Sequence, residues 1–220
     1  MLYRNGSIRL DQGQYRWAGG DCIDDANALR AGGTERILGF SVKAASTLGT
    51  FLRSFRWGHV RQLDAVSRHL LARAWAAGAG PGDAPLTIDL DSTICETYGI
   101  RKEGALHHGY TGVRGYHPLL AVAAGTGDVL MARLRGGNAN SGRSAGHFLT
   151  ETIGRVRSAG ASGQLTMRAD SGFYAYDVVG VCRKADVRFS ITIRQHKGVR
   201  RLIEAIPEDA DPLRGPPRRT

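Results

Sequence analysis

Apolar positions along the chain change their spacing near residue 80. In the preceding part they recur every three or four positions, which is the spacing of an amphipathic helix. Residues 1–20 are an exception, because they are polar and show no periodicity. The glycines and proline of residues 78–82 indicate a linker. The predicted helices run from Asp24 or Asp25 to Arg30, from Ser46 as N-cap through Leu48, Phe51, Leu52 and Phe55, and from Val60 through Trp75.

Beyond the linker the pattern is typical of strands that alternate with helices. Residues 125–128 have the composition of a hairpin turn and lie between two apolar segments. The predicted order, β-β-β-α-β-α-β, describes a mixed sheet with a parallel half. Strands are expected at 86–91, 117–124, 129–135, 164–170 and 187–194, and helices at 145–158, at 175–184 and from about 198.

This change of pattern predicts a division into parts. Residues 1–80 form a small helical module, residues 84–206 form an α/β core, and residues 207–220 are proline-rich, basic and without regular structure. The short helices of the module resemble a helix-turn-helix in outline. Arg53 and Arg56 are its candidate DNA contacts, although exposed arginines occur on the solvated face of any small helical bundle.

The charge of the chain favours a polyanionic partner such as DNA. Thirty Lys and Arg residues against twenty Asp and Glu residues give a net charge of +10 and a pI near 10.1. Cys22, Cys95 and Cys182 are widely spaced, so neither a disulfide framework nor a zinc site is predicted. We expect a cytoplasmic protein with no membrane partner, because no signal peptide and no apolar run of bilayer length is present.

Two aspartates at strand ends are the candidate catalytic residues. Asp89 and Asp91 share one face of the first strand, because side chains alternate along a strand. Asp170 ends the fourth strand, and Ser171-Gly172 then allows a sharp turn. If these two strands are neighbours, Asp91 and Asp170 meet at the carboxyl edge of the sheet, where ligands gather.

Such a pair suits a divalent cation, since carboxylates are hard oxygen ligands. Phosphodiester chemistry uses two magnesium ions about 3.5 to 4 Å apart, which stabilise the entering and leaving oxygens. A structural alternative stays open, in which Asp91 caps a strand end and Asp170 forms a turn with the backbone of Gly172. A third interpretation is a haloacid-dehalogenase-type phosphatase, with Asp89 as the nucleophile and Asp91 as the acid/base.

Basic residues around the hairpin are further candidate DNA contacts. Arg114 and Arg135 lie on or beside it and are suited to bind phosphate, although arginines on the solvated face of a strand are the commoner case. His117 is expected to contact the substrate strand or to pack within a loop. The adjacent His107 and His108 face opposite ways in an extended segment, so a shared zinc ion is not expected.

Four motifs resemble those of a known family. They are Ile88–Thr93, Gly112–Pro118, Leu134–Asn138 and Met167–Phe173. Together they resemble the catalytic domain of DDE transposases of bacterial insertion sequences, in the thirteen-eighty group, over about residues 19–210. The resemblance implies a ribonuclease-H-like fold, cutting of transposon ends with Mg²⁺ or Mn²⁺, joining of the 3′-hydroxyl to target DNA, and a homodimer on DNA.

The resemblance also assigns individual residues. Asp91 matches the first acid of the family's triad and Asp170 matches the second. The third, a glutamate on a helix beyond a β-rich insertion, has no match, since Glu204 comes too early. We therefore expect a truncated copy that binds DNA and does not transpose. The alternative is a non-catalytic DNA-binding remnant with vestigial acids.

Overall fold

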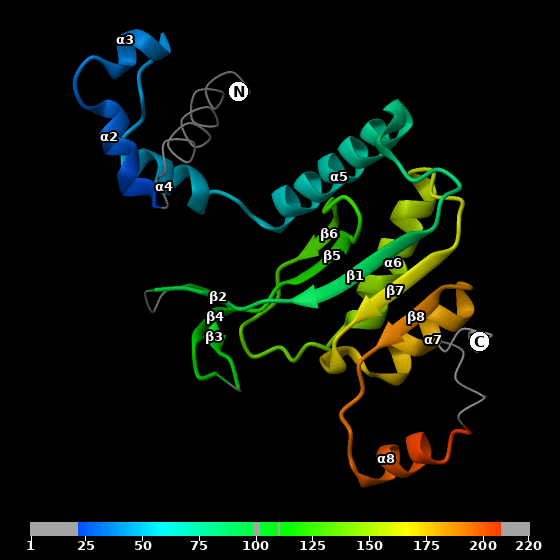
Figure 1. Ribbon diagram of the computed structural model, residues 1–220. Coiled ribbons are helices and arrows are strands. Elements are labelled where there is room, and N and C mark those ends of the chain that lie inside the picture. The colour runs from blue at the N-terminus through cyan, green and yellow to red at the C-terminus, as the bar shows by residue number, and fades with distance from the viewer. Residues whose placement is uncertain (1–21, 99–101, 110, 208–220) are drawn as a thin grey trace, which may run out of the picture. The chain divides into compact units, whose positions relative to one another are not determined.

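The computed structural model describes residues 22–98, 102–109 and 111–207, and the chain forms two compact units (Figure 1). The first comprises Met1–Val66 and the second Ser67–Thr220. The division falls within helix α5 (Trp57–Ala74). The predicted arm of residues 1–20, and the predicted tail beyond residue 207, lie outside the described residues. The domain boundaries that we inferred from the sequence stay a prediction.

The first unit is built from short helices around a small core. Its buried residues Ala26 and Leu48 pack against Ile23, Leu29 and Phe51. The helices predicted from Asp24 or Asp25 to Arg30 and from Ser46 are confirmed, and the one predicted from Val60 through Trp75 corresponds to α5 and the turn that follows it. The elements are η2 (Ile23–Asp25), α2 (Ala26–Arg30), α3 (Thr34–Leu38), α4 (Ala45–Arg53) and the first part of α5.

Two details of the helical prediction were wrong. The N-cap of α4 is Ala44, so Ser46 lies inside the helix and does not cap it. Phe55 lies beyond the end of α4. The short helix α3 was not predicted, because its five residues are too few to show a period; it ends where Gly39 takes a left-handed conformation.

The second unit contains a five-stranded mixed sheet in the order β6-β5-β1-β7-β8. The strands β1, β7 and β8 are parallel to one another, whereas β5 pairs with both β1 and β6 in antiparallel fashion. The predicted hairpin and the predicted α/β class are confirmed. The strands are β1 (Leu86–Ser92), β5 (Leu119–Ala123), β6 (Val129–Arg133), β7 (Leu165–Ala169) and β8 (Arg188–Ile191).

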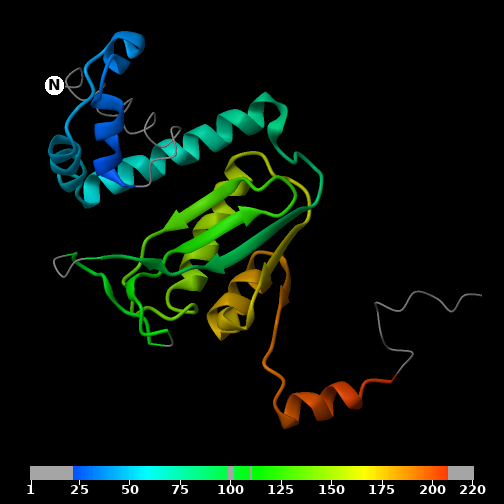
Figure 2. The same ribbon diagram turned by 60° about the vertical axis from the view of Figure 1, so that its left-hand side comes forward.

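Helices α6 (Ala145–Ser158) and α7 (Tyr176–Lys184) cover one face of this sheet (Figures 1 and 2). On that face Ile88 and Leu90 are buried together with Phe148 of α6. The remaining helical elements of this unit are the π-helical turn η3 (Trp75–Ala79), which continues from α5, the 3-10 turn η4 (Ser171–Phe173), and α8 (Lys197–Glu204), the helix expected from about residue 198.

A second, three-stranded sheet was not predicted. Its order is β2-β4-β3, formed by β2 (Cys95–Glu96), β3 (Leu106–His107) and β4 (Arg114–Tyr116). Strands of two or three residues carry too little alternation to be recognised. Gly115 allows the close approach of β2, because a Cβ there would lie 2.2 Å from the carbonyl oxygen of Cys95.

Candidate active site at the carboxyl edge of the sheet

Asp91 and Asp170 lie side by side at the carboxyl edge of the large sheet. The parallel register of β1 and β7 pairs Leu90 with Ala169, and the two aspartates are the next residues on each strand. Neighbouring strands lie about 4.8 Å apart. The predicted pairing of the first and fourth strands is thus confirmed. The role of these residues as metal ligands stays a prediction.

Each aspartate uses one oxygen for a local hydrogen bond. The amide of Ser92 donates to Oδ1 of Asp91 at 2.7 Å. The amide of Gly172 donates to Oδ1 of Asp170 at 2.9 Å, which caps η4. This is the turn contact of our structural alternative. In the described part of the chain these hydrogen bonds engage only Oδ1, so Oδ2 of each aspartate remains for a ligand.

The pair fits a hard cation in its donor chemistry. Both aspartates are solvent-exposed, and exposed carboxylate oxygens are the ligands that Mg²⁺ prefers. No group of three or more His, Cys, Asp or Glu side chains that could hold a metal ion occurs among the described residues. Within them, the edge therefore offers two carboxylates and no third.

Asp89 lies on the same face of β1 but has a different environment. Arg168, its partner in register on β7, donates from Nε to Oδ1 and from Nη2 to Oδ2, both at 2.7 Å. The hydrogen bond and charge of Asp89 raise the pKa of Arg168. Because this bidentate pair occupies both oxygens of Asp89, the structure argues against its use as a phosphatase nucleophile.

A hydrogen-bonded group behind Asp91 was missed in the sequence analysis. The imidazole of His117 is buried, with Nδ1 against the carbonyl oxygen of Ala139 and Nε2 3.1 Å from Oγ of Ser92. Oγ of Ser92 also lies 3.0 Å from Oγ of Ser141. Since both ring nitrogens are engaged inside the protein, these contacts argue against the DNA contact that we expected for His117.

Arg135 is also engaged inside the protein. Its Nε donates to the carbonyl oxygen of His117 at 2.9 Å, and its Nη1 donates to those of Asn140, Ser141 and Arg143 at 2.8 to 3.2 Å. Burial, together with the charge of Arg143, lowers the pKa of Arg135. The guanidinium thus holds the loop after β6 through Nε and Nη1, whereas its Nη2 has no hydrogen-bond partner in the described structure. Contact of Arg135 with DNA stays a prediction.

The other expected DNA contacts lie on β4 and in the first unit. Arg114 on β4 is half-buried, and its Nε donates to the carbonyl oxygen of Ala105 at 2.9 Å. Arg53 and Arg56 are exposed in the first unit, where Nη2 of Arg53 lies 3.4 Å from the hydroxyl of Thr50. Contact of these three arginines with DNA stays a prediction.

The mixed sheet, its covering helices and its strand order define a ribonuclease-H-like α/β domain. The family model described as "Transposase DDE domain group 1" matches residues 2–215. The chain therefore belongs to this family of DDE transposases, which confirms the resemblance; membership of the thirteen-eighty group stays a prediction. No curated protein matches the chain significantly. Among the described residues, no helix has the length and apolar character needed to cross a membrane.

Proposed function

We propose that the chain supplies the first two metal-binding carboxylates of a transposase that cuts transposon ends and joins the 3′-hydroxyl to target DNA. The observation that carries this proposal is the register of β1 and β7, which brings Asp91 and Asp170 to one exposed edge. Family membership supports the reaction type.

Asp91 and Asp170 would hold Mg²⁺ or Mn²⁺ through their Oδ2 atoms. A cation held there supplies stabilisation of the negative charge that develops on the phosphate oxygens. The amides of Ser92 and Gly172 orient the two carboxylates through Oδ1. Arginines bind the DNA backbone, which agrees with the net charge of +10. The functional assembly is a homodimer on DNA.

We further propose that the chain does not cleave DNA on its own. Two carboxylates hold one ion more readily than two, because the second ion of the phosphodiester reaction needs its own ligands. Incubation of supercoiled plasmid with the protein and Mn²⁺ should leave the plasmid intact. Nicking that depends on Asp91 would contradict this proposal and would reveal a third acid that we have not identified.

The metal site is tested by calorimetric titration with Mn²⁺. The wild type should bind one ion, and Asp170→Asn should weaken binding at least about tenfold, as expected for loss of a ligand. Asp89→Asn is the matched control, since Asp89 lies on the same face of the sheet and is paired with Arg168. Equal binding by the wild type and Asp170→Asn, or no binding by the wild type, would contradict a preformed site.

A DNA-binding remnant without catalysis is the second candidate. It is favoured by the hydrogen bonds of the two Oδ1 atoms, which give both acids a structural use. In that case salt-sensitive binding of duplex DNA should survive the double change Asp91→Ala and Asp170→Ala. Loss of Mn²⁺ binding in Asp170→Asn would favour the transposase proposal instead.

A further inference from the structure

We propose that His117 is a positioning residue that holds the strand end carrying Asp91 and the turn carrying Asp170. It acts through a directed chain of hydrogen bonds, from the carbonyl of Ala139 through His117 and Ser92 to Ser141. This inference rests on the proposed function, because it assigns a purpose to residues around the metal-binding pair.

The direction of each hydrogen bond follows from its partners. A backbone carbonyl only accepts, so Nδ1 of His117 carries the proton and donates to Ala139. In a neutral imidazole Nε2 then accepts, and the hydroxyl of Ser92 must donate to it. Oγ of Ser92 is left to accept from the hydroxyl of Ser141. Each polar group in the chain therefore has one defined orientation.

The ring of His117 is held by packing as well. It is only 4% exposed, and the ring of His108 meets it edge-on, with 4.8 Å between the ring centroids. A buried polar ring with both nitrogens satisfied resists rotation, because rotation would leave buried groups without partners. His117 is thus a fixed support for Ser92.

The hydrogen-bond chain reaches Asp91 through Ser92. This residue follows Asp91 directly, and its amide donates to Oδ1 of Asp91 at 2.7 Å. With its hydroxyl held by His117 on one side and by Ser141 on the other, the peptide of Ser92 has little freedom to move. The amide therefore presents a fixed donor to the carboxylate of Asp91.

The chain reaches the second aspartate through Ser141. A Cβ added to Gly172 would lie 2.9 Å from Cβ of Ser141 and 3.1 Å from Oδ1 of Asp170. The turn that Asp170 caps is consequently packed against Ser141 with no room to spare. A shift of Ser141 would move the amide of Gly172, which orients the carboxylate of Asp170.

Arg135 ties the backbones of two members of the hydrogen-bond chain together. One guanidinium donates to the carbonyl oxygens of His117 and Ser141. The backbones of His117 and Ser141 are thereby kept at a constant separation. Arg135, His117 and Ser141 form one rigid group behind the two carboxylates, and none of them needs to contact DNA.

The hydrogen-bond direction is tested by long-range ¹⁵N–¹H NMR correlation of the histidine rings. His117 should be the neutral Nδ1–H tautomer, which is the less favoured form in free histidine, whereas an exposed histidine such as His69 serves as the internal reference. An Nε2–H tautomer, or a charged ring at neutral pH, would overturn the proposed hydrogen-bond directions. This measurement needs no metal, so its outcome is independent of the proposed function.

The positioning role is tested by amide hydrogen exchange. His117→Gln should speed exchange of the Ser92 and Gly172 amides by about tenfold, and Ser92→Ala should do the same at Gly172, because these amides orient the carboxylates. His107→Gln is the matched control, since His107 is an exposed histidine of β3. Ser92→Thr keeps the hydroxyl, so the Gly172 amide in this variant should exchange as slowly as in the wild type. Unchanged exchange at both amides in His117→Gln would overturn the positioning role.

Metal binding then separates the two proposals. If the wild type binds Mn²⁺, Ser92→Ala should raise the Kd about tenfold, within the range for residues that orient ligands, and Ser92→Thr should not. Equal Kd values for Ser92→Ala and the wild type would overturn the inference alone. No binding by the wild type, with the expected tautomer and exchange pattern present, would overturn the proposed function and leave the positioning network standing.

Discussion

The two units of the chain differ in how firmly their cores fix them. In the second unit, strands and helices far apart in sequence share one continuous core, in which Ile88, Phe148 and Met167 are fully buried. In the described part of the first unit the core cluster has two buried residues, Ala26 and Leu48, against partly exposed neighbours, and Val42 and Ala45 are buried outside it. Buried apolar area is the main source of stability. The sheet unit is therefore the one able to hold side chains at fixed positions.

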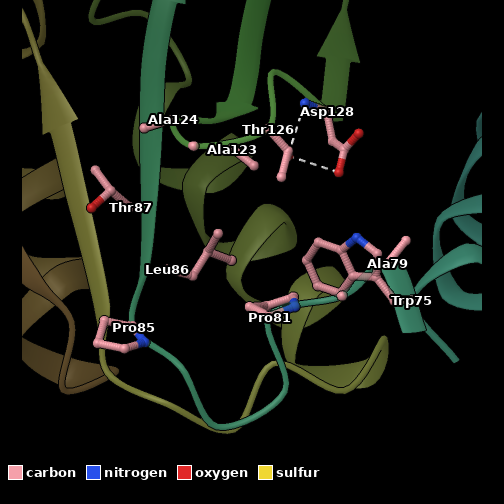
Figure 3. Close-up of a pocket in the computed structure, with 12 residues that line it drawn as sticks. Trp75, Ala79, Pro81, Pro85, Leu86, Thr87, Ala123, Ala124, Thr126 and Asp128 are labelled. Carbon is pink, nitrogen blue, oxygen red and sulfur yellow. Dashed lines mark hydrogen bonds between the residues drawn. The ribbon is translucent and has the colours of Figure 1, made fainter.

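This difference matters because metal ligands must be held closely. Asp91 and Asp170 lie at the ends of β1, the middle strand of the large sheet, and of its parallel neighbour β7. An apolar pocket, lined by Trp75, Pro81 and Leu86, lies at the end of β1 that is remote from the two aspartates (Figure 3). Arg53 and Arg56, by contrast, belong to the unit with the small core; the contact with DNA predicted for them acts through charge and tolerates movement.

The largest effect is expected from Phe148→Ala in the sheet unit. The ring is fully buried between α6 and the sheet, so its removal should lower the free energy of unfolding by about 3–5 kcal/mol. Chemical denaturation followed by circular dichroism would measure this. Phe189→Ala, at a position 44% exposed on β8, is the control and should cost much less. Equal losses of unfolding free energy in the two variants would contradict the expected difference between a core and a surface position.

A smaller effect is expected from Leu48→Ala in the helical unit. The side chain is fully buried, but its neighbours Ile23, Leu29 and Phe51 are only partly buried and can close over the gap. The cost should fall near the low end of the range for Leu→Ala, about 2 kcal/mol. Hydrogen exchange of the α4 amides would measure it, with exposed Leu52→Ala as control. A loss as large as that of Phe148→Ala would contradict the comparison.

A gain is expected from Ala44→Asp in the same unit. Ala44 is the extended N-cap residue of α4 and offers no side-chain acceptor, so an aspartate there should stabilise the helix by about 0.5–1 kcal/mol. The same exchange experiment measures it. Ser46→Ala is the control, because Ser46 lies inside the helix and should show little change. A loss of stability in Ser46→Ala would instead support the capping role that we predicted for Ser46.

Long periodic segments were predictable, whereas short ones were not. The sequence indicated every strand of the large sheet and both of its helices, because each spans enough residues to show a period. The proximity of Asp91 and Asp170 was predicted from their positions at the ends of two strands. Helix α3 and the small sheet were not predicted, since five helical residues make little more than one turn and strands of two or three residues show too little alternation.

The environment of the site was less predictable than its acids. The hydrogen bonds of His117 and Arg135 were not predicted, because their partners Ala139 and Ser141 lie in a loop without periodicity. Ser92 was visible as the neighbour of Asp91, but its hydrogen bonds cross to residues 25 and 49 positions away. Only the tertiary structure brings such partners together.

The smallest effect is expected at the ion pair between Asp89 and Arg168 on the open face of the sheet. The side chain of Arg168 is 60% exposed and that of Asp89 34% exposed, so water and salt screen their attraction. Asp89→Asn should leave the thermal midpoint unchanged in both low and high salt. A fall in midpoint comparable to that of Phe148→Ala would show that the polar face of the sheet, and not the core alone, fixes the strands that carry Asp91 and Asp170.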